Sequence, residues 1–331
     1  MARRRKLRHV MRPLRRLAWP LQALVLAAFW ALSRTLPRAR ASAFGRRLLR
    51  SLGPRLSWHE QLRANLAIAH PQASRDELEA LTRGAWGNLG ATLAEYPHLA
   101  ELAGDDFHRH VELVVDPEVR RWIDSGRPLV FITGHLGNWE LAAAAAAVAA
   151  GPLTAIYAKQ ANPLIDRMVQ RMRRPLGCGF VANDAGARPL LAELVAGRSL
   201  GVLADLRVDS GALLPFFGEA APTTLVPARL ALKFGCPLVP ILVERLAAAR
   251  FRVTACPPLR SRDTRADAAQ QARDMMQQFN GLLETWIAAR PAAWQCLKRR
   301  WSKDVVRRRL AAAAMVDTGG RGASAIAGSS G

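Results

Sequence analysis

The chain has 331 residues, half of them hydrophobic, and a formal net charge of +22. This composition excludes a wholly disordered protein, and the length allows one large domain or two modest ones. Residues 1–50 hold 14 Lys or Arg and no acidic residue, and residues 298–309 hold 7 more, so residues 51–291 carry only about +2. A nearly neutral body argues against nucleic-acid binding, which needs a basic face on the folded part.

Cysteine and histidine spacing gives no metal site. The four cysteines are Cys178, Cys236, Cys256 and Cys296, and they form no C-x-x-C pair. Neither a disulfide framework nor a zinc site is indicated, and a reducing, cytosolic environment fits best. In "FHRHVEL", strand-like alternation would turn His108 and His110 to one face, which we interpret as a solvated strand face. We expect no metal and no bound cofactor.

The first element is an apolar run from Leu17 to Leu32. A helix of that length spans ~24 Å, short of the ~30 Å hydrocarbon core of a bilayer. Arginines flank the run on both sides, which disfavours moving either flank across a membrane. We therefore expect residues 1–45 to be a basic anchor whose helix lies in, or dips into, the cytosolic leaflet. The alternatives are a buried core helix and a secretory signal cleaved near Ala39–Ala41, although arginines there discourage export.

An α/β domain is expected over residues 46–305. From Gly45 to about Leu102 the pattern is helical, with "SRDE" at Ser74–Glu77 as a capping box. Strand-like and helical runs then alternate: "VELVV", "PLVFIT", a helix from Asn138, "LTAIYA", a helix near Ile165–Met172, "LLAELVAG", "SLGVLAD", "ARLALKFG", "PLVPILVE", "RFRVTAC" and a helix over about Ala266–Ala289. Such alternation predicts a central mixed sheet, parallel at least in part, flanked by helices. Residues 306–331 are predicted to be a disordered tail.

The stretch "FITGHLGNWE" places a histidine between a buried strand and a helix. His135 follows the strand, Gly134 permits a sharp turn, and Asn138 is a good N-cap. The carboxyl end of a strand is where open α/β sheets gather catalytic groups. If His135 lies in the turn, Glu140 can reach back to form a carboxylate–imidazole pair, which would make His135 a general base. Backbone amides at the helix start would then face a developing oxyanion. Alternatively, Glu140 only complements the helix dipole.

The "GHLGNWE" stretch resembles the H-x-x-x-x-E block of the bacterial lipid A late acyltransferases, a branch of the glycerolipid acyltransferase superfamily whose wider members carry H-x-x-x-x-D. The similarity covers residues 45–303. Its other blocks, in order, are "RANLAIAHPQ", "RGAWGNLGATLAEY", "IYAKQANPLID", "LADLRVDSGALLPFFGEAAPTT", "GCPLVPILVER" and "WQCLKRRW". Together these blocks are far more specific than the His135 and Glu140 spacing alone.

The resemblance implies transfer of a fatty acyl chain from acyl carrier protein to a hydroxyl of an acylated, phosphorylated glucosamine disaccharide, at the cytoplasmic face of the bacterial inner membrane. It implies that His135 is the base and Glu140 its partner. The substrate-binding positions it implies are Asn138, Trp139, Lys159, Asp205, Arg299 and Arg300. Four positions depart from the family pattern: Lys159 replaces an arginine, Leu206 a glutamine, Cys296 a tryptophan and Lys298 a histidine.

Several functions stay open on the sequence alone. Another acyl acceptor, such as a lysophospholipid, an ornithine lipid or a different glycolipid, is the nearest alternative. From other classes, a basic nucleic-acid-binding protein would account for the net charge, and a catalytically silent membrane scaffold would account for the anchor. Partners expected for the leading interpretation are acyl carrier protein, an anionic glycolipid and membrane lipids, with no nucleic acid.

Overall fold

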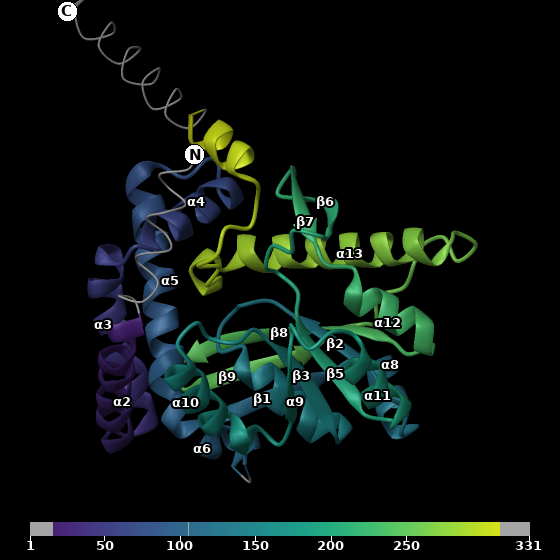
Figure 1. The fold of residues 1–331 in the computed structure, drawn as a ribbon, viewed down its shortest axis with the longest axis horizontal. Coiled ribbons are helices and arrows are strands. Elements are labelled where there is room, and N and C mark those ends of the chain that lie inside the picture. Colours follow the sequence, from purple (N-terminus) through teal and green to yellow (C-terminus); the bar gives the residue numbers. More distant parts are fainter. Residues whose placement is uncertain (1–15, 105, 312–331) are drawn as a thin grey trace, which may run out of the picture.

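The computed structural model describes residues 16–104 and 106–311, and its helices and strands follow the predicted alternation (Figure 1). The helices are α2 (Trp19–Thr35), α3 (Arg38–Leu52), α4 (His59–Ala69), α5 (Arg75–Glu95), α6 (Leu99–Ala103), α7 (Phe107–His110), α8 (Pro117–Asp124), α9 (Glu140–Ala150), α10 (Pro163–Arg173), α11 (Arg188–Val195), α12 (Val226–Phe234) and α13 (Ala268–Ala289). The strands are β1 (Val111–Val115), β2 (Val130–Thr133), β3 (Leu153–Tyr157), β4 (Gly179–Ala182), β5 (Ser199–Leu203), β6 (Ala212–Phe216), β7 (Glu219–Thr223), β8 (Leu238–Ala247) and β9 (Arg250–Ala255).

A single mixed sheet forms the centre of the molecule, in the order β1-β9-β8-β2-β5-β3-β4. Neighbouring strands run parallel except β8 and β9, which are antiparallel. The hairpin β6–β7 stands apart from it. The predicted α/β fold with a mixed central sheet is therefore confirmed, and the sheet is mostly parallel. The sequence patterns did not predict β4 or the hairpin.

Alternating side chains of β2 supply the two halves of the core. Val130 and Ile132 belong to a cluster that also contains residues of α12 and α13, whereas Phe131 belongs to a second cluster with residues of α6 and α9. Figure 1 shows α13 running along one side of the sheet. Both faces of the sheet are thus covered, and a buried parallel strand of this kind reads as continuous apolar sequence. Because the faces are covered, the carboxyl ends of β2 and β5 are where we look for a functional site, as in other open α/β sheets.

The N-terminal helices pack tightly on the body. A Cβ at Gly45 of α3 would lie 2.2 Å from the carbonyl oxygen of Gly90 in α5, so the two backbones are in direct contact. In α2, the Trp30 indole is buried and donates to the carbonyl oxygen of Leu93 at 2.9 Å. The capping box at Ser74 is confirmed. The predicted boundary at residue 45 falls inside α3, and α2 and α3 are structurally part of the body.

The other face of α2 carries uncovered apolar side chains. The exposed large apolar residues of α2 are Leu21, Leu24, Val25 and Leu32, and Leu17, two residues before the helix, is also exposed. In the described ranges, no helix combines the length and apolar character needed to cross a bilayer.

Two local predictions were wrong. The segment with His108 and His110 is the short helix α7, because Phe107 is buried and anchors a helical turn before β1 begins. Residues 306–311, the described part of the predicted disordered tail, are helical, and Arg308 and Arg309 both form ion pairs with Glu219 at the hairpin. Residues 1–15 and 312–331 lie outside the described part. Among the described residues, no group of His, Cys, Asp or Glu could hold a metal ion.

Candidate active site

His135 and Asp205 meet where two neighbouring parallel strands end. Each stands two residues beyond its strand, His135 after β2 and Asp205 after β5. The His135 backbone N–H donates to Asp205 Oδ2 at 3.0 Å, and His135 Nδ1 lies 2.7 Å from Asp205 Oδ1. This is the sheet edge at which α/β proteins assemble catalytic groups.

The surroundings of Asp205 keep its carboxylate charged. The side chain is fully buried, and the Trp294 indole also donates to Oδ2, at 3.0 Å. Burial alone would raise the pKa of Asp205, but the charge of His135 and the hydrogen bonds from His135 and Trp294 outweigh it and hold the pKa below the ordinary value. An ionised carboxylate here requires a proton on His135 Nδ1, which leaves Nε2 free to accept one. The His135 side chain is 19% exposed, so a substrate can reach it.

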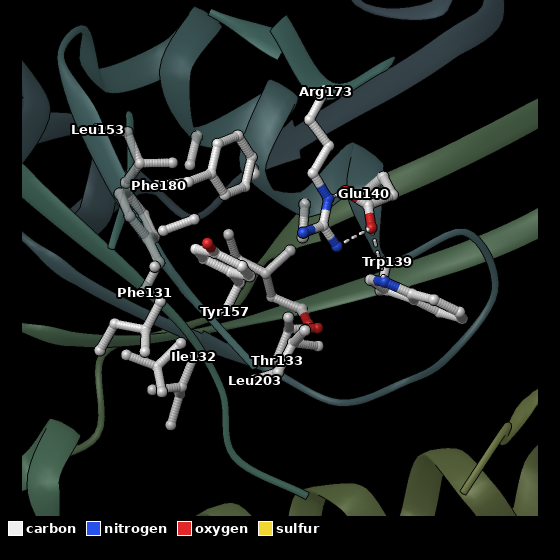
Figure 2. A pocket seen from close by; sticks show the side chains of 18 residues that line it. Phe131, Ile132, Thr133, Trp139, Glu140, Leu153, Tyr157, Arg173, Phe180 and Leu203 are labelled. Atoms are coloured by element: carbon white, nitrogen blue, oxygen red, sulfur yellow. Dashed lines mark hydrogen bonds and ion pairs between the residues drawn. The ribbon is translucent and has the colours of Figure 1, made fainter. Parts of the chain in front are cut away.

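Glu140, the predicted partner of His135, is held elsewhere (Figure 2). Its carboxylate accepts two hydrogen bonds from Arg173, at 2.6 and 2.9 Å, one from the Tyr96 hydroxyl at 2.7 Å and one from the Trp139 indole at 3.0 Å. The predicted contact between His135 and Glu140 is therefore wrong. Glu140 opens α9 and its side chain meets the end of α10, whereas His135 faces β5.

The charges around Glu140 reinforce one another. Burial raises the pKa of Tyr96, and the adjacent Glu140 carboxylate raises it further, so the phenol stays protonated as a donor. Burial would lower the pKa of Arg173, but Glu140 outweighs that effect and the pKa is raised. Glu140 is linked to His135 only indirectly: it accepts from the Trp139 indole, and the centroid of the Trp139 ring lies 5.1 Å from that of the His135 ring.

Asn138 is buried and works within the protein. Its side-chain oxygen accepts from the Glu140 backbone N–H at 3.3 Å, but the predicted N-cap position is wrong, because α9 begins at Glu140 and Trp139 is its N-cap residue. Its amide donates to Glu95 at 2.9 Å, and Glu95 forms a buried ion pair with Arg245 of β8. These contacts tie the start of α9 to α5 and β8, so the structure places Asn138 among supporting residues.

A narrow apolar cavity with a free volume of about 50 Å³ lies between α9 and the sheet, beside the His135 turn. Small residues leave this space: Ala142, Ala143 and Ala146 come from α9, and Gly201 from β5. Thr133, Trp139 and Glu140, which flank His135 in sequence, also line it, and Figure 2 shows Phe131 and Phe180 among its walls. Most of this lining is apolar, as an alkyl chain requires, but the free volume is well below the ~300 to 1,000 Å³ of typical small-molecule pockets.

The three predicted cations have unrelated settings. Lys159 is exposed and pairs with Asp184 at 3.1 Å. Arg299 is partly buried. Arg300, predicted to bind substrate, is fully buried, donates to the Pro222 carbonyl at 2.7 Å and lies over the Phe216 ring, so its contacts are inside the protein. The buried guanidinium instead fastens the closing segment to the β6–β7 hairpin.

Comparison with known proteins identifies the family. Residues 11–303 match the model of the bacterial lipid A biosynthesis acyltransferase family. The chain belongs to this family. It is an acyltransferase, and the resemblance seen in the sequence blocks is confirmed. Among curated proteins it is similar to a phosphatidylinositol mannoside acyltransferase of Mycolicibacterium smegmatis, with 27% identity over 288 residues that cover 84% of this chain and 91% of the relative. Among solved structures it matches the 1-acyl-sn-glycerophosphate acyltransferase PlsC of Thermotoga maritima, with 13% identity, a TM-score of 0.32, and coverage of 86% of this chain and all of the other.

Sequence reasoning missed four residues of the site. Arg173 stands in "RMRR", which reads as a surface basic run, and Tyr96 ends the helical lead-in without a local signal. Trp294 and Gln295 open the "WQCLKRRW" block, whose aromatic residues were the only indication that it packs against the site. All four act through contacts between segments far apart in sequence.

Proposed function

We propose that this acyltransferase transfers a fatty acyl chain from acyl carrier protein to a hydroxyl of a lipid A precursor, at the cytoplasmic face of the bacterial inner membrane. The observation that carries the proposal is the pair of His135 and the buried Asp205 at the end of β2 and β5, next to an apolar cavity. The family assignment supplies the reaction class. The pair supplies the general base that the class requires.

The geometry supports direct attack by the acceptor. His135 Nε2 removes the proton of the acceptor hydroxyl, and the oxygen attacks the carbonyl carbon of the donor thioester. The carbon–sulfur bond then breaks, and the leaving thiolate takes the proton from the imidazolium, which restores the neutral ring. Asp205 stabilises the imidazolium through Nδ1, 2.7 Å away. Acyl carrier protein is a co-substrate in this scheme, and the proposal needs no further cofactor.

A second acceptor class is a glycolipid built on phosphatidylinositol. The similarity to the phosphatidylinositol mannoside acyltransferase extends over 91% of that protein and favours this candidate. A lysophospholipid or an ornithine lipid remains the broader alternative. Mass spectrometry of total lipids, lipid A included, from cells with and without the gene distinguishes these acceptors, because only the true product loses one acyl chain when the gene is absent.

The base is tested by His135→Ala. General-base catalysis contributes typically ~10² to 10⁴ in rate, so turnover with an acyl carrier protein donor should fall by at least that order. The melting transition is measured on the same preparation, because the variant also removes the Nδ1 donor of the buried Asp205 carboxylate, and only a loss of turnover in folded protein tests the base. His108→Ala, which removes an exposed imidazole from α7, is the matched control and should leave turnover unchanged. Near wild-type turnover in His135→Ala would reject the mechanism.

Membrane association is assigned to α2. Its exposed leucines and valine offer apolar surface beside the densest positive charge in the sequence, which suits anionic lipid. Replacing Leu21, Leu24 and Val25 together with serine should weaken sedimentation with vesicles that contain an anionic phospholipid, while the packed face that carries Trp30 stays intact. Val195→Ser on α11, where the side chain is 77% exposed, is the control. Equal sedimentation of the triple variant and the control would contradict the assignment.

A further inference from the structure

The segment that follows α13 contacts both members of the catalytic pair. The Trp294 indole donates to Asp205 Oδ2 at 3.0 Å, and the Gln295 backbone N–H donates to the His135 carbonyl oxygen at 2.9 Å. Between them, Leu136 and Trp294 form an antiparallel bridge. Trp294 is fully buried and Gln295 nearly so. The acid and the turn that carries the base are thus held by two adjacent residues.

The carbonyl oxygen of Gly137 is the second point at which the turn is fixed. It accepts from Gln295 Nε2 at 2.6 Å, from the Thr92 hydroxyl at 3.0 Å and from the Asn88 amide at 3.2 Å. Gly137 has φ +58°, and a Cβ there would lie 2.6 Å from the carbonyl oxygen of Val243. Only glycine fits such a position, and three donors leave its peptide plane one orientation.

The Gln295 amide donates to Gly137 although its own side-chain oxygen is left without a partner in the described part of the chain, which costs stability. Its side-chain oxygen is buried and has no hydrogen-bond partner among the described residues. Reversing the amide would not help, because its oxygen would then face the carbonyl oxygens of Gly137 and Ala293. A buried, unsatisfied acceptor destabilises a fold. A side chain that serves only packing at this position would be apolar, so the arrangement points to a use for its two donors at the turn.

We propose that Trp294 and Gln295 are positioning residues for acyl transfer: Trp294 holds one oxygen of Asp205 so that the other meets His135 Nδ1, and Gln295 holds the turn that carries His135. The inference rests on the proposed function of His135 as the general base. Neither residue touches the reacting atoms. Both act through the orientation and the charge of the pair.

The indole also tunes the strength of the carboxylate. A donor on Oδ2 draws negative charge away from the oxygen that faces the imidazole. Without it, more negative charge stays on the Asp205 oxygen that faces the imidazole, and we expect the acid limb of the rate profile to move to higher pH. Within residues 16–104 and 106–311, Cys296 and Arg300 also interact with the Asp205 charge, and the substitution leaves both in place.

The test compares Trp294→Phe with Trp301→Phe in the full-length protein. Both tryptophans are fully buried, and Trp301 donates to the Phe216 carbonyl at 3.2 Å, so each variant loses one buried indole donor. For Trp294→Phe we expect kcat to fall ~10-fold with KM changed less than ~2-fold, and the midpoint of the acid limb to rise by ~0.5 pH units or more. Trp301→Phe should leave that midpoint unchanged. If Trp294→Phe fails to fold, a second variant replaces Trp294 with 3-benzothienylalanine, which keeps the bicyclic ring and removes only the N–H. We expect the same upward shift of the acid limb in this variant.

Gln295→Met tests the second contact, since methionine fills a similar volume without donors. We expect kcat to fall ~5- to 10-fold with an unshifted acid limb, because the charge on Asp205 is untouched. The control Gln278→Met removes a half-buried amide that also donates two hydrogen bonds, to the Arg260 carbonyl and Asp274, and should keep wild-type kcat. An unshifted limb in both Trp294 variants, or a kcat for Gln295→Met equal to that of Gln278→Met, would overturn the positioning role. If His135→Ala is active, the proposed function fails instead. If His135→Ala is inactive and the positioning variants match their controls, only this inference fails.

Discussion

Two buried carboxylates flank the turn that carries His135, and they face different basic side chains. One oxygen of Asp205 faces the imidazole of His135, and that imidazole is partly exposed to solvent. Both oxygens of Glu140 instead accept hydrogen bonds from Arg173, one from Nε and one from Nη2. A carboxylate already paired with a permanent cation has little left to stabilise a transient one. Proximity in sequence to the histidine therefore does not select the partner of the base. The side chain that each carboxylate faces indicates its role: Asp205 is placed to stabilise a protonated His135, whereas Glu140 holds Arg173 in the packed structure.

The largest expected effect is that of Asp205→Asn on turnover. The amide nitrogen would donate to His135 Nδ1 and force the proton onto Nε2, the atom that must accept it from substrate. We expect kcat to fall by ~10³ to 10⁴, as measured by acyl transfer from a carrier-protein donor. Asp304→Asn, which changes an exposed aspartate, serves as the control.

The pH dependence of stability checks the same residue independently. Because the pKa of Asp205 is lowered in the folded state, its charge contributes stability at pH values above the ordinary aspartate range, and the contribution is lost as the pH falls through the folded value. The difference in unfolding free energy between wild type and Asp205→Asn should therefore shrink below about pH 4. A difference that grows toward acid pH would contradict an ionised Asp205.

Glu140→Gln should act on stability first. It leaves Arg173 charged with only 10% of its side chain exposed, and removing one partner of a buried pair typically costs ~3 to 5 kcal/mol. Chemical denaturation should show a loss of this order, and activity should fall because Trp139 loses its anchor beside His135. The double variant Glu140→Gln with Arg173→Met should recover much of the stability. The contrary result would be a Glu140→Gln variant with wild-type stability and a loss of turnover as large as that of Asp205→Asn. Glu140 would then act directly in the reaction, and the contrast between the two carboxylates would be wrong.

The sequence predicted the elements of the site better than their contacts. The position of His135 followed from local pattern, because a buried strand, a glycine and an asparagine near the helix start specify a strand–turn–helix unit. The pairing with Asp205 depends on β5 lying next to β2, although 70 residues separate the two side chains, and no local pattern encodes that neighbour. The burial of two arginines could not be predicted either. Arg173 and Arg300 lie in basic runs that are typical of a surface, and only the structure shows that both are buried.

Arg300 extends the comparison to a buried cation without a carboxylate. It donates to the Pro222 carbonyl and the Thr223 hydroxyl, and burial lowers its pKa. Arg300→Met removes the shorter donor from each acceptor and leaves only the Val208 N–H and the Asn280 amide, both at 3.4 Å, which costs ~1 to 3 kcal/mol in unfolding free energy. KM for donor and acceptor should not change, because the guanidinium is out of reach of substrate. A raised KM at unchanged stability would restore the binding role that the sequence suggested.

The smallest expected effect belongs to the exposed pair of Lys159 and Asp184. The Lys159 side chain is 55% exposed, and the carboxylate of Asp184 raises its pKa, so it offers a permanent cation two residues beyond β3. If this cation meets an anionic substrate, Asp184 competes for it. Lys159→Ala should then raise KM for the anionic acceptor by about 2- to 5-fold at low salt, and Asp184→Ala should lower it, with no change in melting temperature. Lys159→Arg should behave as wild type or better, because a guanidinium can grip phosphate with two hydrogen bonds. Unchanged KM in all three variants would place Lys159 outside the site and confine recognition of the acceptor to other residues.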